Sequence, residues 1–231
     1  MAIRGVIKKL FAAIEQVDHT TVQRIVVEEP SLSHVEYRKK LPLSVATWSG
    51  CIESIRVLLA ALQQEPASAL SRSIGEALGA IVYSNRISVL PLLLEGAAAA
   101  GLDPYGDCEH IVDEAVSFGR PAKFVEALLD AGAPYSQPVH WAAQRGTPAV
   151  MRLLLKRAVG DPNETMHVKT AIELARSRRN TEAPKVGQKL VDLLQQYVPK
   201  PGTANLPWVG WRERCLLRLI RRCPANGARV R

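Results

Sequence analysis

Residues 138–155 contain the stretch that decides the fold of this chain, PVHWAAQRGTPAVMRLLL. It predicts two helices joined by a tight turn. Gly146 is expected to end the first helix, because glycine reaches the positive φ of a C-terminal cap without a Cβ clash. Pro148 suits the first turn of the second helix. Met151 and Leu154 recur at helical spacing, so the second helix has one buried face.

One such unit cannot bury its own apolar face, so the chain must contain further copies. Equivalent apolar positions recur along the chain at intervals of 35, 33, 28 and 33 residues. These positions are Leu43, Leu78, Ile111, Val139 and Ile172. The stretch resembles the ankyrin repeat, whose T-P-L-H-x-A-A…G…V-x-x-L-L pattern it follows with Gln137 in place of threonine. Ankyrin repeats have a period of about 33 residues. The resemblance therefore implies an all-α fold, an ankyrin-repeat solenoid of stacked helix-turn-helix units.

The other copies follow this pattern with some departures. Pro42 and Gly50 stand where the repeat has its proline and glycine. Asn85 replaces the glycine of the third copy, and asparagine is the next-best residue for a left-handed position. Pro91 falls inside the helix that follows and is expected to bend it. In the first copy, Thr20 or Thr21 is expected to cap the second helix.

The chain divides into four parts on this interpretation. The repeat array is expected to hold five to six units, with a more polar final helix as an end cap. The parts are an N-terminal lead-in (1–9), the array (10–197), a Pro/Gly-rich linker (198–210) and a basic amphipathic C-terminal helix and tail (211–231).

Composition places the chain among folded proteins, with 47% hydrophobic and 23% charged residues in 231. The formal net charge is +8, and residues 198–231 hold eight basic residues and one acidic residue, so only +1 remains for the first 197. Its four cysteines form no C-x-x-C pair, which favours reduced thiols. The longest apolar region, residues 87–102, is interrupted by proline, glutamate and glycine, so no transmembrane segment is expected. We expect a cytoplasmic or nuclear protein.

Catalysis finds little support in the sequence. Asp107, Cys108, Glu109 and His110 are consecutive, but a nucleophile needs a base and an orienting group brought together across space. No phosphate-binding glycine loop and no paired zinc-ligand spacing occur. The resemblance implies that His140 is structural, hydrogen-bonding within and between turns. We therefore expect a protein that is not an enzyme and that has no cofactor and no metal.

A partner-binding surface is predicted from a column of residues. Trp48 and Tyr83 each lie five residues after an equivalent apolar position, and the resemblance implies that this part of the first helix lines the concave face. Aromatic and arginine side chains dominate binding energy at interfaces. The alternative is that each ring packs on a neighbouring repeat. The residues of the predicted surface are Trp48, Ser49, Tyr83, Ser84, Trp141, Gln144 and Arg145.

The tail has three possible roles. Residues 211–223 form an amphipathic pattern with arginines on one side. That helix either docks on the last repeat, or binds a partner helix, nucleic acid or an acidic surface, or acts as a degenerate SOCS box. Trp211-x-x-x-Cys215 is similar to the L-x-x-x-C of that box, with tryptophan for leucine. The tail residues predicted to bind a partner are Arg214, Arg218, Arg221 and Arg222.

The expected function is binding of another protein on the concave ankyrin face, as a regulatory adaptor such as a transcription co-regulator. This rests on the resemblance, because a fold does not fix a function. The alternative, a substrate adaptor of a ubiquitin ligase, depends on the SOCS-box-like helix.

Overall fold

The computed structural model describes residues 2–106, 108–157, 165–180 and 183–196. The linker, the tail and its arginines lie outside this range, and so does Asp107. The described residues form helices and no strand. Two 3-10 turns, η1 (Pro30–His34) and η2 (Ile87–Val89), accompany the α-helices. The α-helices are α1 (Ala2–Glu15), α2 (His19–Glu28), α3 (Pro42–Ser49), α4 (Ile52–Leu62), α5 (Ala67–Ser84), α6 (Leu90–Ala99), α7 (Ile111–Ser117), α8 (Ala122–Asp130), α9 (Pro138–Gln144), α10 (Pro148–Lys156), α11 (Thr165–Asn180) and α12 (Pro184–Gln195).

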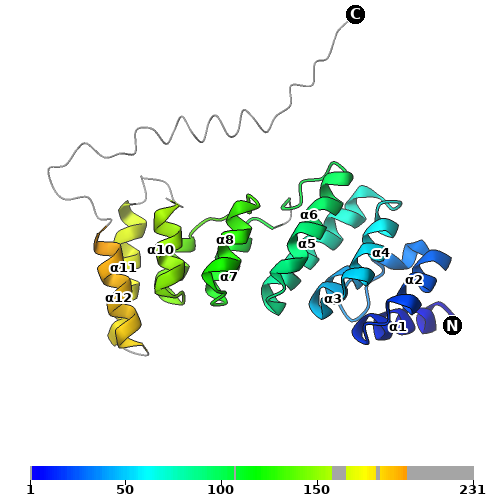
Figure 1. The fold of residues 1–231 in the computed structure, drawn as a ribbon, viewed down its shortest axis with the longest axis horizontal. Coiled ribbons are helices and arrows are strands. Elements are labelled where there is room, and N and C mark those ends of the chain that lie inside the picture. Colours follow the sequence, from blue (N-terminus) through cyan, green and yellow to red (C-terminus); the bar gives the residue numbers. More distant parts are fainter. Residues whose placement is uncertain (1, 107, 158–164, 181–182, 197–231) are drawn as a thin grey trace, which may run out of the picture.

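The helices are stacked as pairs in single file, from α1 and α2 at one end to α11 and α12 at the other (Figure 1). Each odd-numbered helix packs against its even-numbered partner and against the odd-numbered helices of neighbouring pairs. The odd-numbered helices therefore form one continuous row, called here the odd row, and a side chain at a given place in one pair lies beside its counterpart in the next.

The core confirms the positions that the sequence treats as equivalent. Leu43, Leu78, Ile111, Val139 and Ile172 are all buried, one on each of α3, α5, α7, α9 and α11. The helix ends agree locally as well. Pro42 and Pro148 lie in the first turns of α3 and α10, and Gly50 and Asn85 follow α3 and α5 with φ of +77° and +59°. Local cap chemistry thus sets the ends of these helices.

The structure corrects the expectation that Gly146 adopts a positive φ at the end of α9. Its φ is not among the positive values found in the described residues. A Cβ at this position would lie 2.6 Å from Cα and 2.8 Å from the carbonyl oxygen of Ala142. Glycine is required because the chain leaves α9 in close contact with its last turn, not because the turn is left-handed.

Three helix boundaries also differ from expectation. The lead-in at residues 2–9 is the first part of α1, because Val6 and Ile7 pack against the core ahead of the buried Leu10. Asp18, not a threonine, caps α2 by accepting the N–H of Thr21 at 3.1 Å. Pro91 does not bend a helix, since α6 begins only at Leu90, after η2, and the proline occupies its first turn.

Helix α5 is longer than the repeat pattern predicts, with 18 residues. The N-terminal half of α5 lies beside the segment that joins η1 to α3, because the guanidinium of Arg72 donates to the carboxylate of Glu36 at 2.7 Å. In that segment Tyr37 and Lys40 exchange two backbone hydrogen bonds of 3.0 and 3.1 Å. These residues form a hairpin whose turn has two residues, and it lies just before α3. It is called here the Tyr37–Lys40 hairpin.

The described helices include none that is both long and apolar enough to cross a bilayer.

Candidate protein-binding groove

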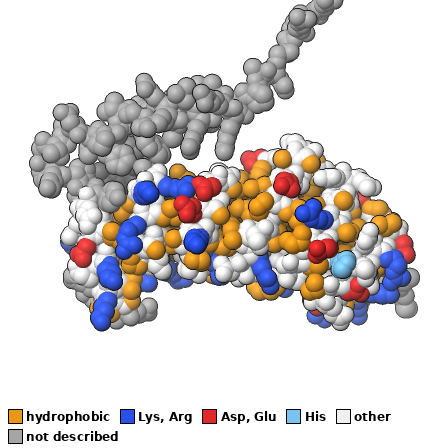
Figure 2. Space-filling model, viewed as in Figure 1, with side chains coloured by type: hydrophobic (Ala, Val, Ile, Leu, Met, Phe, Trp, Pro, Cys, Tyr) orange, Lys and Arg blue, Asp and Glu red, His pale blue; other side chains and the backbone are white. Residues whose placement is uncertain are grey.

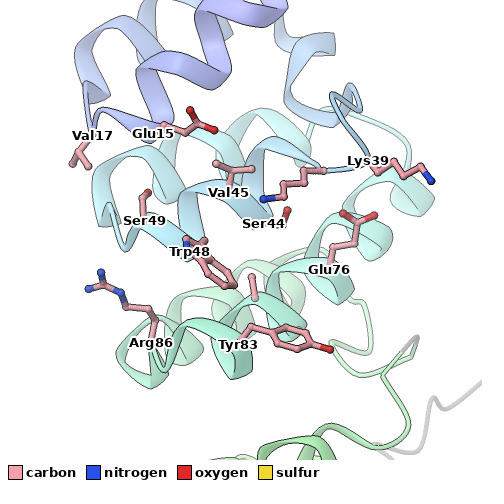
Figure 3. Close-up of a pocket in the computed structure, with 13 residues that line it drawn as sticks. Glu15, Val17, Lys39, Ser44, Val45, Trp48, Ser49, Glu76, Tyr83 and Arg86 are labelled. Atoms are coloured by element: carbon pink, nitrogen blue, oxygen red, sulfur yellow. The ribbon is translucent and has the colours of Figure 1, made fainter. Parts of the chain in front are cut away.

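A groove of about 860 Å³ opens on the odd row between α1, α3 and α5 (Figure 3). It is called here the α1–α5 groove. Its walls come from the end of α1, the Tyr37–Lys40 hairpin, and one side of α3 and of α5. The lining residues are Glu15, Val17, Lys39, Lys40, Ser44, Val45, Trp48, Ser49, Glu76, Gly79, Ala80, Tyr83 and Arg86.

The two predicted aromatic residues lie together in this groove. Trp48 comes from α3 and Tyr83 from α5, and their side chains lie close to one another in Figure 3. They are 55% and 48% exposed, so about half of each residue is available to a partner. Each precedes a left-handed residue by two positions, Gly50 and Asn85. The same register on two neighbouring helices therefore directs both side chains into one groove.

A third aromatic residue extends this row. Phe118, at the end of α7, is 48% exposed and lies edge-on to Tyr83, with ring centroids 4.7 Å apart and an interplanar angle of 70°. The guanidinium of Arg120 donates to the backbone oxygen of Tyr83 at 3.3 Å. These contacts join the end of α5 to the end of α7, one through the ring of Tyr83 and the other through its backbone oxygen.

The hairpin beside the groove holds two residues in an unfavourable conformation. Arg38 and Lys39 have φ of +53° and +60°, as a type I′ turn requires at both central positions. Asparagine and glycine are the usual residues there. For side chains with an ordinary Cβ, the left-handed region costs roughly 1–2 kcal/mol per residue.

Val17 shows the same kind of strain at the opposite wall. It follows α1 with φ of +60°, although it is β-branched, and it is 49% exposed. The turn is closed by the N–H of Asp18, which donates to the oxygen of Ala13 at 2.8 Å. Among the described residues, the non-glycine positions with positive φ either line the groove or adjoin a lining residue. Strained residues of this kind concentrate at functional sites.

The charges around the groove are unevenly paired. Glu76 forms an ion pair with Arg72, at 3.5 Å, and shares that arginine with Glu36. The guanidinium of Arg86 lies close to the backbone of Gly50. A Cβ added to Gly50 would lie 3.0 Å from the Cζ atom of Arg86. Lys39 and Lys40 take part in no ion pair within the described part of the chain. Elsewhere, Lys and Arg side chains gather at the end of the molecule that holds α11 and α12 (Figure 2).

The other residues of the predicted surface are not all in this groove. Ser49 lines it, whereas the hydroxyl of Ser84 donates to the oxygen of Ala80 at 2.6 Å and is not part of the lining. Gln144 and Arg145 are exposed at the end of α9, away from the groove. The structure therefore divides the predicted column, with Gln144 and Arg145 on α9 separate from Trp48 and Tyr83.

Trp141 lines a second, smaller hollow of about 240 Å³ between α7 and α9. Its ring lies edge-on to that of His140, at 5.9 Å. The hollow is lined by His110, Asp113, Glu114, Ser117, Ser136, Gln137 and Trp141.

Asp113 gives this hollow a structural character. Its carboxylate is buried and accepts the backbone N–H groups of Ser136 and Gln137 at 2.6 and 3.0 Å, which ties α7 to the start of α9. Burial raises the pKa of Asp113, and these two hydrogen bonds partly offset that rise. His110 lies 3.7 Å from the same carboxylate.

The thiol of Cys108 donates to the backbone oxygen of Gly75 on α5, at 3.4 Å. No three His, Cys, Asp or Glu side chains within the described ranges lie close enough together to hold a metal ion.

Several residues in the groove or beside it were not predicted from the sequence. Phe118 was missed because five residues after Ile111 stands Val116, which is buried. Lys39, Lys40 and Val17 were missed because no sequence signal marks a left-handed turn built from such residues.

No family model, no curated protein and no solved structure matches this chain. Its function is therefore inferred from the geometry and the charges of the groove.

Proposed function

We propose that this protein is a divergent ankyrin-type repeat protein that binds another protein through the α1–α5 groove, as a regulatory adaptor without catalytic activity. The observation that carries the proposal is the pair of half-exposed aromatic residues, Trp48 and Tyr83, on neighbouring helices of one groove. Large aromatic residues in a well-defined hollow are the usual anchors of protein interfaces.

Two further features support a binding role. The groove spans three successive helix pairs, so one extended partner segment can contact several units at once, as repeat arrays commonly allow. The strained residues Val17 and Lys39 form part of its wall. Core packing does not require these strained conformations. Backbone strain of this kind is expected where binding has selected the local conformation.

The proposal is tested by replacing both rings together, W48A/Y83A, in the full chain. The matched control is Tyr135→Ala, an aromatic residue that is 39% exposed outside the groove. In quantitative pull-downs, the wild type and the Tyr135→Ala control should both capture certain proteins. The double variant should fail to capture those same proteins. Direct titration of a purified recovered protein should show at least about tenfold weaker binding, as expected when an interface anchor is truncated.

Thermal unfolding separates binding from packing. Since about half of each aromatic residue is already exposed, the double variant should keep a cooperative unfolding transition. If W48A/Y83A instead unfolds the chain, the rings belong to the core and the proposal is wrong. Equal recovery of every protein by the wild type and the double variant would contradict it as well.

A further inference from the structure

The Tyr37–Lys40 hairpin carries a charge pattern that the aromatic anchors do not account for. Arg38, Lys39 and Lys40 are consecutive cations, and the two at the centre of the turn have positive φ. Asparagine and glycine would fit the backbone of this turn better, and the side chain of Arg38 offsets only part of that cost, through its contact with the ring of Tyr37. A break of a local backbone rule that packing does not fully offset is expected at functional positions.

The hairpin is held firmly at its base. The ring of Tyr37 packs against that of Phe11 on α1, with centroids 5.1 Å apart. The guanidinium of Arg38 lies over the ring of Tyr37, 5.3 Å from its centroid. The base is thus anchored to α1 and the hairpin projects beside the groove.

Nearby carboxylates do not neutralise these cations. Glu36, directly before the hairpin, is paired with Arg72 at 2.7 Å, and Glu76 on α5 is paired with the same arginine at 3.5 Å. Within the described part of the chain, none of the three hairpin cations is in an ion pair. The hairpin therefore presents a local excess of positive charge to a ligand.

We propose that the hairpin recognises acidic side chains in the partner segment that the α1–α5 groove binds. This inference rests on the proposed function. The partner is an extended peptide segment that contacts Trp48 and Tyr83 with an apolar side chain and places neighbouring Asp or Glu residues against Arg38, Lys39 and Lys40. Charge complementarity of this kind sets the register and orientation of a partner more than its total affinity.

The charges favour an acidic protein segment over a nucleic acid. Glu15 and Glu76 also line the groove, and they would repel a phosphate backbone that continued along it. A peptide can place its negative charges at the hairpin alone. An apolar anchor beside a short acidic cluster fits both the rings and the unpaired cations.

A random peptide library displayed on phage and selected against the immobilised full chain tests this inference. The informative variant is R38N/K39G, which removes two charges and supplies the residues that a type I′ turn prefers, so it should fold at least as well as the wild type. The matched control is R24Q/K123Q, which removes two exposed charges on α2 and α8.

The wild type and the control should select peptides in which acidic residues adjoin an apolar one, while R38N/K39G should select apolar residues without the acidic preference. A synthetic peptide of the selected sequence should bind R38N/K39G roughly five- to tenfold more weakly, and the difference should shrink at high salt. Selection without acidic enrichment, or equal binding by R38N/K39G and the wild type, overturns the inference.

The two proposals fail separately. If W48A/Y83A binds the selected peptide as tightly as the wild type, or if the wild type selects no peptide, the proposed function fails. If the aromatic variant loses binding and R38N/K39G does not, only the acidic preference fails. A single-stranded RNA oligonucleotide serves as a further probe. Binding of that RNA, lost in R38N/K39G, with no acidic peptide selected, would also overturn the inference.

Discussion

Replacement of Gly146 by alanine tests how the units are joined. The added Cβ would lie 2.6 and 2.8 Å from backbone atoms of Ala142, well inside ordinary contact, and backbone atoms cannot rotate away as a side chain can. Relief of such overpacking costs about 1–3 kcal/mol. The oxygen of Gly146 also accepts a hydrogen bond from Arg178 on α11, at 2.7 Å, and its displacement would cost about 1 kcal/mol more. We expect Gly146→Ala to lower the free energy of unfolding by about 2–4 kcal/mol.

Two comparisons identify the cause. Gly79 lies inside α5 with no atom within 4 Å of an added Cβ, so Gly79→Ala should raise the free energy of unfolding by about 0.5–1 kcal/mol. Gly119 has φ of +67° and open space around it, and asparagine tolerates such a conformation. Gly119→Asn should therefore be nearly neutral, whereas Gly146→Asn should be as damaging as Gly146→Ala.

Urea denaturation followed by far-UV circular dichroism measures these differences. The slope of the free energy against urea concentration must stay constant for the comparison to hold. A Gly146→Ala variant within about 0.5 kcal/mol of the wild type would refute the close contact between α9 and the turn that follows it. A clear rescue by asparagine at position 146 would show that the turn is left-handed after all.

Further expected outcomes concern the hairpin and two carboxylates. In R38N/K39G, the relief of left-handed strain should raise the free energy of unfolding by about 1 kcal/mol in the same urea assay, after the extra freedom of glycine in the unfolded chain is counted. Hydrogen bonds from the hydroxyl of Thr20 and from Thr21 lower the pKa of Asp18 to about 2. Its contribution to stability is therefore present above about pH 4 and lost as the pH falls toward 2, and Asp18→Asn should remove that part of the acid dependence measured by thermal unfolding. Asp113→Ala should destabilise the chain by about 1–3 kcal/mol, because two backbone N–H groups lose their acceptor. Since the pKa of Asp113 is raised, wild-type stability should decline slightly as the pH rises just above 4, and a decline of equal size in Asp113→Asn would contradict that assignment.

Local signals account for the parts of the fold that the sequence predicts. Apolar spacing and the proline or glycine at a helix end act within one helical turn, so the pairs α3–α4 and α9–α10 can be located from residues 41–59 and 138–155. The same signals misplace features that depend on neighbouring units. Gly146 looks like an ordinary left-handed cap, but only the path of the chain shows that it is needed for close contact.

The groove was only partly predictable for the same reason. Trp48 and Tyr83 share one register and were found by counting from the buried residues. Phe118 was missed because it lies seven residues after Ile111, whereas Trp48 lies five after Leu43. The Tyr37–Lys40 hairpin had no signal at all, since its central residues are among those that such turns disfavour.

Hydrogen exchange measured by mass spectrometry, with and without a peptide selected by the full chain, tests the central claim most directly. If the α1–α5 groove binds the partner segment, the peptide should slow exchange at residues 37–49 and 76–86 and leave α8 and α10 unchanged. Protection confined to residues 197–231, or to α9 and α11, would contradict the account and place the binding site elsewhere.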